Sequence, residues 1–124
     1  MLSIAPAAQV ILVAGVTDMR KGFNCLSAIV QNDIKKDPLS ARHLYVFCNR
    51  NRNRIKILFW ECGGLWLCSK RLERGTFAWP TMGTPYIEMA PEELMLLLGG
   101  IDASTLHRRP WYQAAQHLTI KYAK

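Results

Sequence analysis

The sequence predicts an α+β domain in which an antiparallel sheet packs against one long and one short helix. Apolar side chains recur every three or four residues between 19 and 36, which places one apolar stripe on a helix. From residue 43 onward the period changes to two, which is typical of strands. Both elements must bury an apolar surface, so hairpins within 43–89 are expected to pack against the helix.

The N-terminal third is predicted to contain a strand followed by the long helix. A β-branched apolar run predicts the strand over Gln9–Ala14. Thr17 or Asp18 is expected to cap the helix, since a short side-chain oxygen can accept hydrogen bonds from the amides of the first turn. The helix should run over about 19–36 and end before Pro38.

The remaining elements follow from turn residues and from the apolar alternation. Gly63-Gly64 predicts a tight turn between two antiparallel strands. Pro91, followed by two glutamates, predicts the start of a short helix at about 91–98. Strands are expected over 44–48, 55–60 and 65–72, with short pieces at 76–79 and 86–89. The expected core residues are Phe23, Leu26, Val30, Val46, Ile57 and Leu67.

Length and composition favour one domain over 1–103, followed by a basic C-terminal tail over 104–124. The first basic residue is Arg20, too late for a secretory signal, and apolar runs are too short to span a membrane. The four cysteines lack C-x-x-C spacing and the three histidines are scattered. We therefore expect a cytoplasmic protein with unpaired cysteines, no metal site and no cofactor.

Positive charge is clustered along the chain. The whole sequence has a formal net charge of +7, and residues 42–74 carry eight basic against two acidic groups, a net +6. Clustered charge of one sign indicates an acidic partner, such as nucleic acid or an acidic protein surface.

The centre of this cluster is the stretch "NRNRNR" at residues 49–54, the predicted tip of a hairpin. Its arginines Arg50, Arg52 and Arg54 carry planar donors that match phosphate oxygens, so the tip is predicted to contact a nucleic-acid backbone. A purely structural role is the alternative, because charged side chains keep an exposed hairpin soluble and protect it from edge pairing.

Further basic residues extend the candidate nucleic-acid-binding set. Strand alternation sends Lys70 and Arg71 to opposite faces of the sheet, so these two cannot form one patch within a regular strand. The additional candidates are Lys56, Lys70, Arg71, Arg74, Arg108 and Arg109.

A second candidate site is "TDMRKG" at residues 17–22. If a helix begins here, its free amides together with Arg20 and Lys21 can bind an anion or a partner's carboxylate, with Thr17 and Asp18 as neighbours. The alternative is a capped helix in which the two cations are solvated or paired with Asp18. A glycine within the first turn of a helix favours the binding role, because it permits close approach of another backbone.

Catalysis is not expected. Asp18, Glu61, Glu73 and Asp102 could supply carboxylates for metal-assisted phosphoryl chemistry, but no spacing singles them out.

Two long stretches carry a family resemblance: "GVTDMRKGF" at 15–23 and "RIKILFWECGGLWLCSKRLERGTFAWP" at 54–80. With "PEELMLLLGGID", they resemble the accessory proteins, called TnpB or Orf2-like, of the insertion sequence 66 family of bacterial mobile elements. The resemblance covers about residues 10–102. It implies a role in transposition beside a separate, larger transposase that carries the acidic catalytic triad. Relatives tend to have glycine and an acidic residue among the tip arginines, where this chain has asparagines, so its tip is more uniformly positive.

Two functions remain open at this point. In the first, a non-catalytic accessory protein binds DNA through its basic hairpin and tail. In the second, the protein is an adaptor whose basic face docks on the transposase or on another element-encoded protein.

Overall fold

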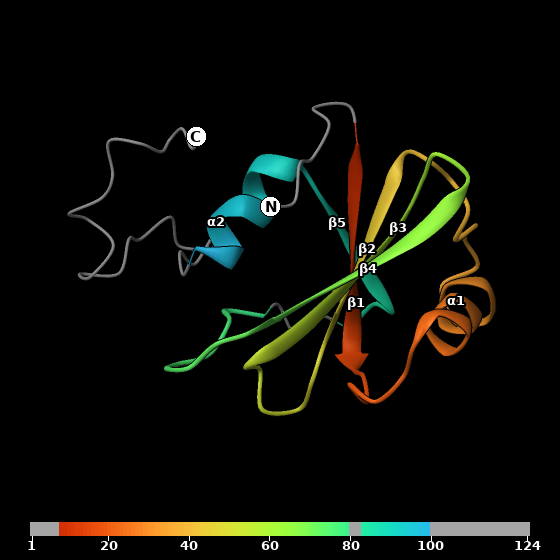
Figure 1. The fold of residues 1–124 in the computed structure, drawn as a ribbon. Helices are drawn as coiled ribbons and strands as arrows, with labels where there is room; N and C mark the ends of the chain where they lie inside the picture. The colour runs from red at the N-terminus through yellow and green to blue at the C-terminus, as the bar shows by residue number, and fades with distance from the viewer. Residues whose placement is uncertain (1–7, 80–82, 100–124) are drawn as a thin grey trace.

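One five-stranded mixed sheet with a helix on each face forms the fold, in a computed structural model that describes residues 8–79 and 83–99 (Figure 1). The elements are β1 (Gln9–Val16), α1 (Phe23–Asn32), β2 (His43–Cys48), β3 (Arg54–Glu61), β4 (Gly64–Arg71), β5 (Tyr86–Met89) and α2 (Pro91–Leu98). The strand order is β4-β3-β2-β1-β5. The α+β class and the packing of the sheet against helices are confirmed.

The pairing of β1 with β2 is parallel, whereas the sequence predicted antiparallel hairpins within 43–89 and assigned no partner to the strand over Gln9–Ala14. Val10 pairs with Leu44 and Leu12 with Val46, and α1 supplies the crossover between the two strands. Strand periodicity reveals a strand but not its neighbour, so this β-α-β unit was missed. As a result β1 is an internal strand between β2 and β5, and the C-terminal ends of β1 and β2 lie at the same end of the sheet.

The other pairings are antiparallel. β2 pairs with β3 and β3 with β4, as predicted for the two hairpins, and β1 also pairs with β5. A two-residue turn joins β3 to β4, with Cys62 at φ 50° and Gly63 at φ 83° between the paired residues Glu61 and Gly64. Two successive positive φ values are the geometry that matches the twist of a tight hairpin.

Alternation along the strands divides the core between the two faces of the sheet. Side chains such as Val46 and Ile57 pack with α2, whereas Tyr45 and Leu58 pack with α1. Leu26, Val30, Val46 and Ile57 are buried, as predicted. The prediction was wrong for Phe23, which is 47% exposed on the first turn of α1, and for Leu67, which is half-buried because β4 is an edge strand.

The predicted long helix is shorter at both ends. It begins at Phe23, with Gly22 as its N-cap and no side-chain cap, so neither Thr17 nor Asp18 caps it. It ends at Asn32, and Lys35 then adopts a left-handed conformation with φ 63°. Residues 17–22 therefore form a loop. Neither described helix is long and apolar enough to cross a membrane.

The C-terminal elements agree with the prediction except in one segment. β5 and α2 form where expected, and the Glu93 carboxylate accepts a hydrogen bond from the Ala90 amide at the start of α2. Residues 76–79 are not a strand; they attach to the β2–β3 tip through a bond from the Phe77 amide to the Arg52 carbonyl (2.7 Å). The predicted basic tail over 104–124 lies outside the described residues.

Candidate nucleic-acid interface

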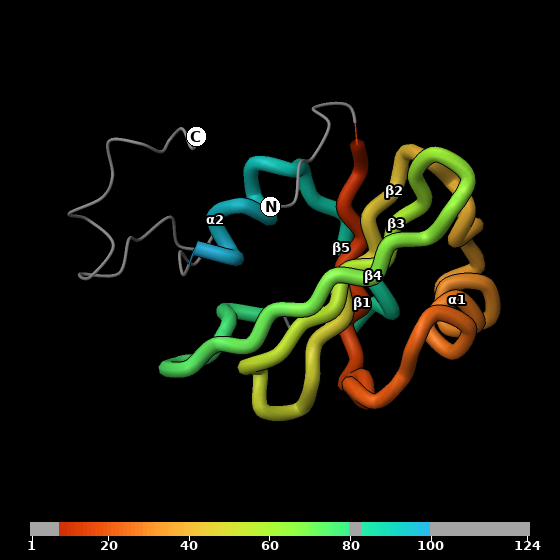
Figure 2. The backbone as a smooth tube through the Cα atoms, viewed as in Figure 1, coloured from red at the N-terminus to blue at the C-terminus, as the bar shows by residue number. Residues whose placement is uncertain are grey.

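The two candidate sites of the sequence, the loop at 17–22 and the hairpin tip at 49–54, lie side by side. Because β1 and β2 are parallel, the segments that follow them begin at the same end of the sheet, where both strands have their C-terminal ends (Figure 2). The amide of Thr17 donates to the carbonyl of Cys48 (2.9 Å), which ties the two exits together. Segments more than 25 residues apart thus build one surface.

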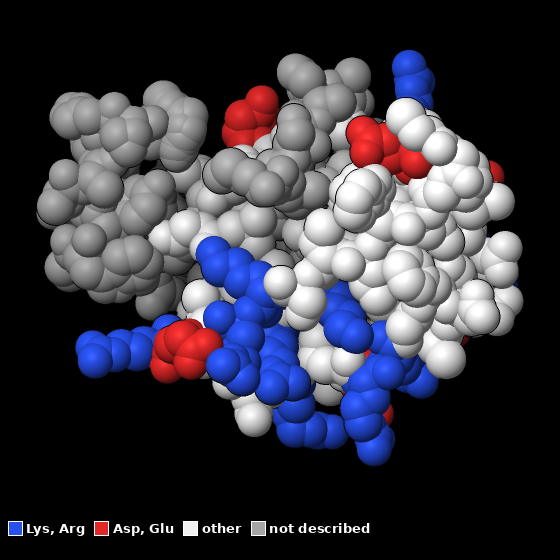
Figure 3. All heavy atoms as spheres, viewed as in Figure 1, with Lys and Arg blue, Asp and Glu red and all other residues white. Residues whose placement is uncertain are grey.

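This surface contains an open hollow of about 860 Å³, which we call the basic groove. Four cationic side chains line it: Arg20, Lys21, Arg50 and Arg54. The rest of the lining is Val16, Thr17, Asp18, Met19, Asn49, Asn51 and Asn53. Figure 3 shows Lys and Arg side chains gathered over this end of the sheet.

Asparagine side chains hold the tip in shape. The Asn49 side-chain oxygen accepts hydrogen bonds from the amides of Asn53 and Arg54, both at 3.1 Å. The Asn49 amide group donates to the side-chain oxygen of Asn53 (2.8 Å). Within the tip, Arg52 adopts the left-handed conformation, with φ 58°. These bonds fix the backbone that presents Arg50 and Arg54.

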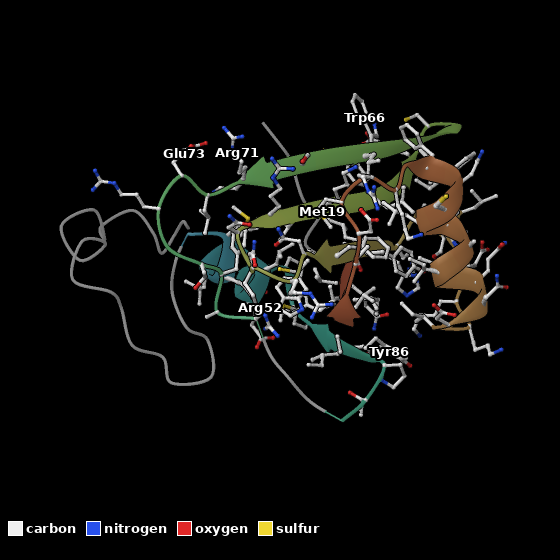
Figure 4. All side chains as sticks on the ribbon, turned by 90° about the horizontal axis from the view of Figure 1, so that it is seen from below. Met19, Arg52, Trp66, Arg71, Glu73 and Tyr86 are labelled. Carbon is white, nitrogen blue, oxygen red and sulfur yellow. The ribbon has the colours of Figure 1, made fainter. Side chains whose placement is uncertain are left out.

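Arg52 leaves the groove and serves the fold. Its Nη1 donates to the backbone carbonyl oxygen of Trp79 (2.9 Å), and its side chain is half-buried. In Figure 4 it lies apart from Arg71, which sits beside Glu73 at the end of β4. The three tip arginines therefore do not form one row, because only Arg50 and Arg54 line the groove.

In the loop at 17–22, an ion pair replaces the predicted helix cap. Asp18 accepts hydrogen bonds from the Arg20 amide (2.9 Å) and from Arg20 Nη2 (2.7 Å) and Nε (3.1 Å). These bonds hold the pKa of Asp18 well below its usual range. The Arg20 side chain is nevertheless 90% exposed. Because α1 begins only at Phe23, the amides of residues 17–22 are loop amides and not, as was predicted, those of a helix start.

In the structure, Gly22 does not support the close approach of another backbone to the loop at 17–22. It lies before the first turn of α1, and a Cβ built on it would meet nothing within 4 Å. Glycine at an N-cap is ordinary, so its presence needs no ligand.

A second, smaller hollow of about 450 Å³ adjoins the groove on the α1 face of β3 and β4. It shares Met19 and Arg54 with the groove, and we call it the sheet hollow. Its remaining lining is Lys56, Ser69, Arg71 and Glu73. Met19 and Ser69 were missed by sequence reasoning, but the Gly63 turn fixes the β3–β4 register and could have identified Ser69 opposite Lys56.

The other basic candidates lie elsewhere. Lys70 is on the opposite face from Arg71, as alternation predicts, and its Nζ donates to the Leu98 carbonyl at the end of α2 (3.1 Å). Arg74 is exposed in the loop after β4. Arg108 and Arg109 lie outside the described residues.

The carboxylates that were considered for catalysis have neighbours within the fold. Glu61 accepts a bond from the Trp66 indole (3.0 Å), and Glu73 pairs with Arg71 (3.0 Å). Asp102 lies outside the described part of the chain. Over residues 8–79 and 83–99, no group of three or more His, Cys, Asp or Glu side chains could hold a metal ion.

Comparisons with known proteins agree with the resemblance in the sequence. A family model described as "IS66 Orf2 like protein" matches residues 8–108. Two proteins of Sinorhizobium fredii are similar. The uncharacterized protein y4hO is 38% identical over 102 residues, covering 82% of this chain and 88% of the relative; y4jC is 30% identical, covering 82% and 86%. No solved structure matches the chain significantly.

Proposed function

The chain belongs to the family of IS66 Orf2-like proteins, and from this premise we propose that it binds the DNA backbone through its basic groove. Membership associates the protein with transposition in an accessory role. The finer proposal is a non-catalytic, cytoplasmic DNA-binding protein that works beside the transposase of its element.

One observation carries the proposal: four cationic side chains from two distant segments line a single hollow. Among the described residues, Arg50 and Arg54 have no carboxylate within salt-bridge distance. Four cations against one carboxylate, that of Asp18, leave the groove with an excess of positive charge, which attracts a polyanion over long range. Arginine also presents several donors to each phosphate, which favours backbone contact.

The remaining basic residues extend this proposal. Arg71 and Lys56 adjoin the groove through the sheet hollow. Lys70, Arg74 and the tail residues Arg108 and Arg109 are proposed as peripheral contacts for longer DNA.

Val16 supports a second candidate function. It is 55% exposed and lines the basic groove. A valine side chain has no hydrogen-bond donor for a phosphate oxygen. An acidic protein with an apolar contact residue would use both features. The second candidate is therefore an adaptor that docks on the transposase or on another element-encoded protein.

Salt dependence of duplex binding tests the first function. The plot of log affinity against log salt has a negative slope, and Arg50→Ala should make it less steep by about 0.9 if Arg50 contacts one phosphate. Arg50→Ala/Arg54→Ala should make it less steep by about twice that amount if each arginine contacts one phosphate. Arg42→Ala is the matched control, because Arg42 is exposed and adjoins the start of β2, at the opposite end of that strand from the groove.

Equal slopes for the parent protein, Arg50→Ala and the double variant would contradict DNA binding through the groove. Binding of the purified transposase that is lost in Arg50→Ala/Arg54→Ala, with no change in DNA affinity, would support the adaptor. In cells, Arg20→Ala/Lys21→Ala should abolish transposition while leaving the melting temperature unchanged, because both side chains belong to the groove rather than to the core.

A further inference from the structure

Four polar side chains on the α1 face of the sheet form two directly facing pairs. Arg54 on β3 faces Arg71 on β4, and Lys56 faces Ser69 one pair further along. The Leu72 amide donates to the Asn53 carbonyl (2.7 Å), which makes that pair hydrogen-bonded. By the alternation of an antiparallel ladder, Arg54–Arg71 is then a non-hydrogen-bonded pair, the kind whose side chains approach most closely.

Two arginines in this position repel each other. Like charges directly opposite on neighbouring strands destabilise a sheet, so an anion bound between them would be stabilising. Glu73 supplies part of this negative charge, with its Oε2 3.0 Å from both Arg71 Nε and Nη2. The Glu73 side chain is 75% exposed, and such pairs are weak. Arg54 has no acidic partner within salt-bridge distance in the described part of the chain.

Lys56 adds a third positive charge to the same place. Its Nζ donates to the Lys21 carbonyl (2.9 Å), a bond that leaves the ammonium with two further donors. Ser69 opposite it offers a hydroxyl. Two guanidinium groups, one ammonium and one hydroxyl therefore line a hollow of about 450 Å³.

We propose that the sheet hollow is a discrete binding site for one phosphate group, and that Glu73 is an internal competitor for it at Arg71. This inference rests on the proposed function in that the phosphate belongs to the bound DNA. Two forked guanidinium groups and an ammonium match the several oxygens and the charge of a phosphate, whereas a single carboxylate satisfies only one of the arginines, as Glu73 does.

Titration with inorganic phosphate tests the site without DNA. In ¹⁵N-labelled protein, phosphate at constant ionic strength should saturably shift the amide signals of Arg54, Lys56, Ser69 and Arg71, and chloride should not. Arg54→Gln/Arg71→Gln should abolish the shifts, and Arg42→Gln should leave them unchanged. Glu73→Gln should bind phosphate about two- to fivefold more tightly, because an exposed ion pair no longer competes.

Absence of saturable shifts in the parent protein would overturn the proposal, and so would equal affinities of the parent and the Arg54→Gln/Arg71→Gln variant. If Glu73→Gln binds phosphate with the same affinity as the parent, Glu73 does not compete with phosphate for Arg71. Because all these substitutions replace exposed side chains, the variants should fold, and their amide spectra check this directly.

Two sources of phosphate are distinguished with duplexes that carry or lack a 5′ terminal phosphate. Equal affinities for the two duplexes identify a backbone diester, and tighter binding of the phosphorylated duplex identifies a strand end. Saturable phosphate shifts without duplex binding would refute the proposed function and keep the phosphate site. Duplex binding that depends on Arg50, without saturable phosphate shifts, would refute the phosphate site and keep the proposed function.

Discussion

Arg52 Nη1 donates a hydrogen bond to the backbone carbonyl oxygen of Trp79, 2.9 Å away, and thereby joins the tip of the β2–β3 hairpin to the segment after β4. The Phe77 amide returns a bond to the Arg52 carbonyl (2.7 Å). An arginine in the middle of a basic tip thus anchors the fold, while its neighbours Arg50 and Arg54 face the groove.

Arg52→Ala should lower the free energy of unfolding by about 1 to 2 kcal/mol, since it leaves a half-buried carbonyl without its charged donor. Arg50→Ala, the matched control, should change the free energy of unfolding by less than about 0.5 kcal/mol because Arg50 is exposed. Urea unfolding measures both. Equal stabilities for the two variants would show that the Trp79 contact contributes nothing.

Arg54→Gln should raise the melting temperature at low salt. The substitution keeps a long polar side chain and removes the like charge opposite Arg71, which is worth a few tenths of a kcal/mol. The gain should shrink at high salt, because screening weakens the repulsion in the parent protein. Thermal unfolding at two ionic strengths checks this, and a lower melting temperature at low salt would contradict it.

Ile57→Ala should lower the free energy of unfolding by about 2 to 5 kcal/mol, since Ile57 is 4% exposed between the sheet and α2. Phe23→Ala should cost much less despite the larger side chain, because Phe23 is about half exposed. Leu67→Ala should fall between them. Denaturant midpoints of the three variants rank the sites, and a greater loss for Phe23 than for Ile57 would show that the core is misassigned.

Stability should fall as the pH rises above about 9. Burial raises the pKa of Cys48 from 9.0 to about 11, and burial followed by the Asp37 charge raises that of Tyr45 from 10.0 to about 12. Between each ordinary and raised value the folded protein holds more protons than the unfolded chain, so higher pH favours unfolding.

Tyr45→Phe should flatten the decline between pH 10 and 12. The variant should also be less stable at neutral pH, because the Tyr45 hydroxyl donates to the Asp37 carbonyl (2.8 Å). Unfolding in urea across this pH range measures both effects. An equally steep decline in parent and variant would exclude Tyr45 as its cause.

Much of the fold could be predicted from local pattern. The spacing of Leu26 and Val30 identified the buried side of α1, Gly63 identified the β3–β4 turn, and Pro91 marked the start of α2. Each of these signals depends on residues within a few positions of one another, and short-range backbone and side-chain preferences act over the same distance.

The sequence by itself determined which segments carry positive charge, where most helices and strands lie, and that the chain belongs with transposition accessory proteins. Only the tertiary structure decided which of those charges act together. The parallel pairing of β1 with β2 places Lys21 and Arg50 in one groove, and the contact with Trp79 holds Arg52 outside that groove. These relationships depend on packing between segments far apart in the chain, which local periodicity cannot encode.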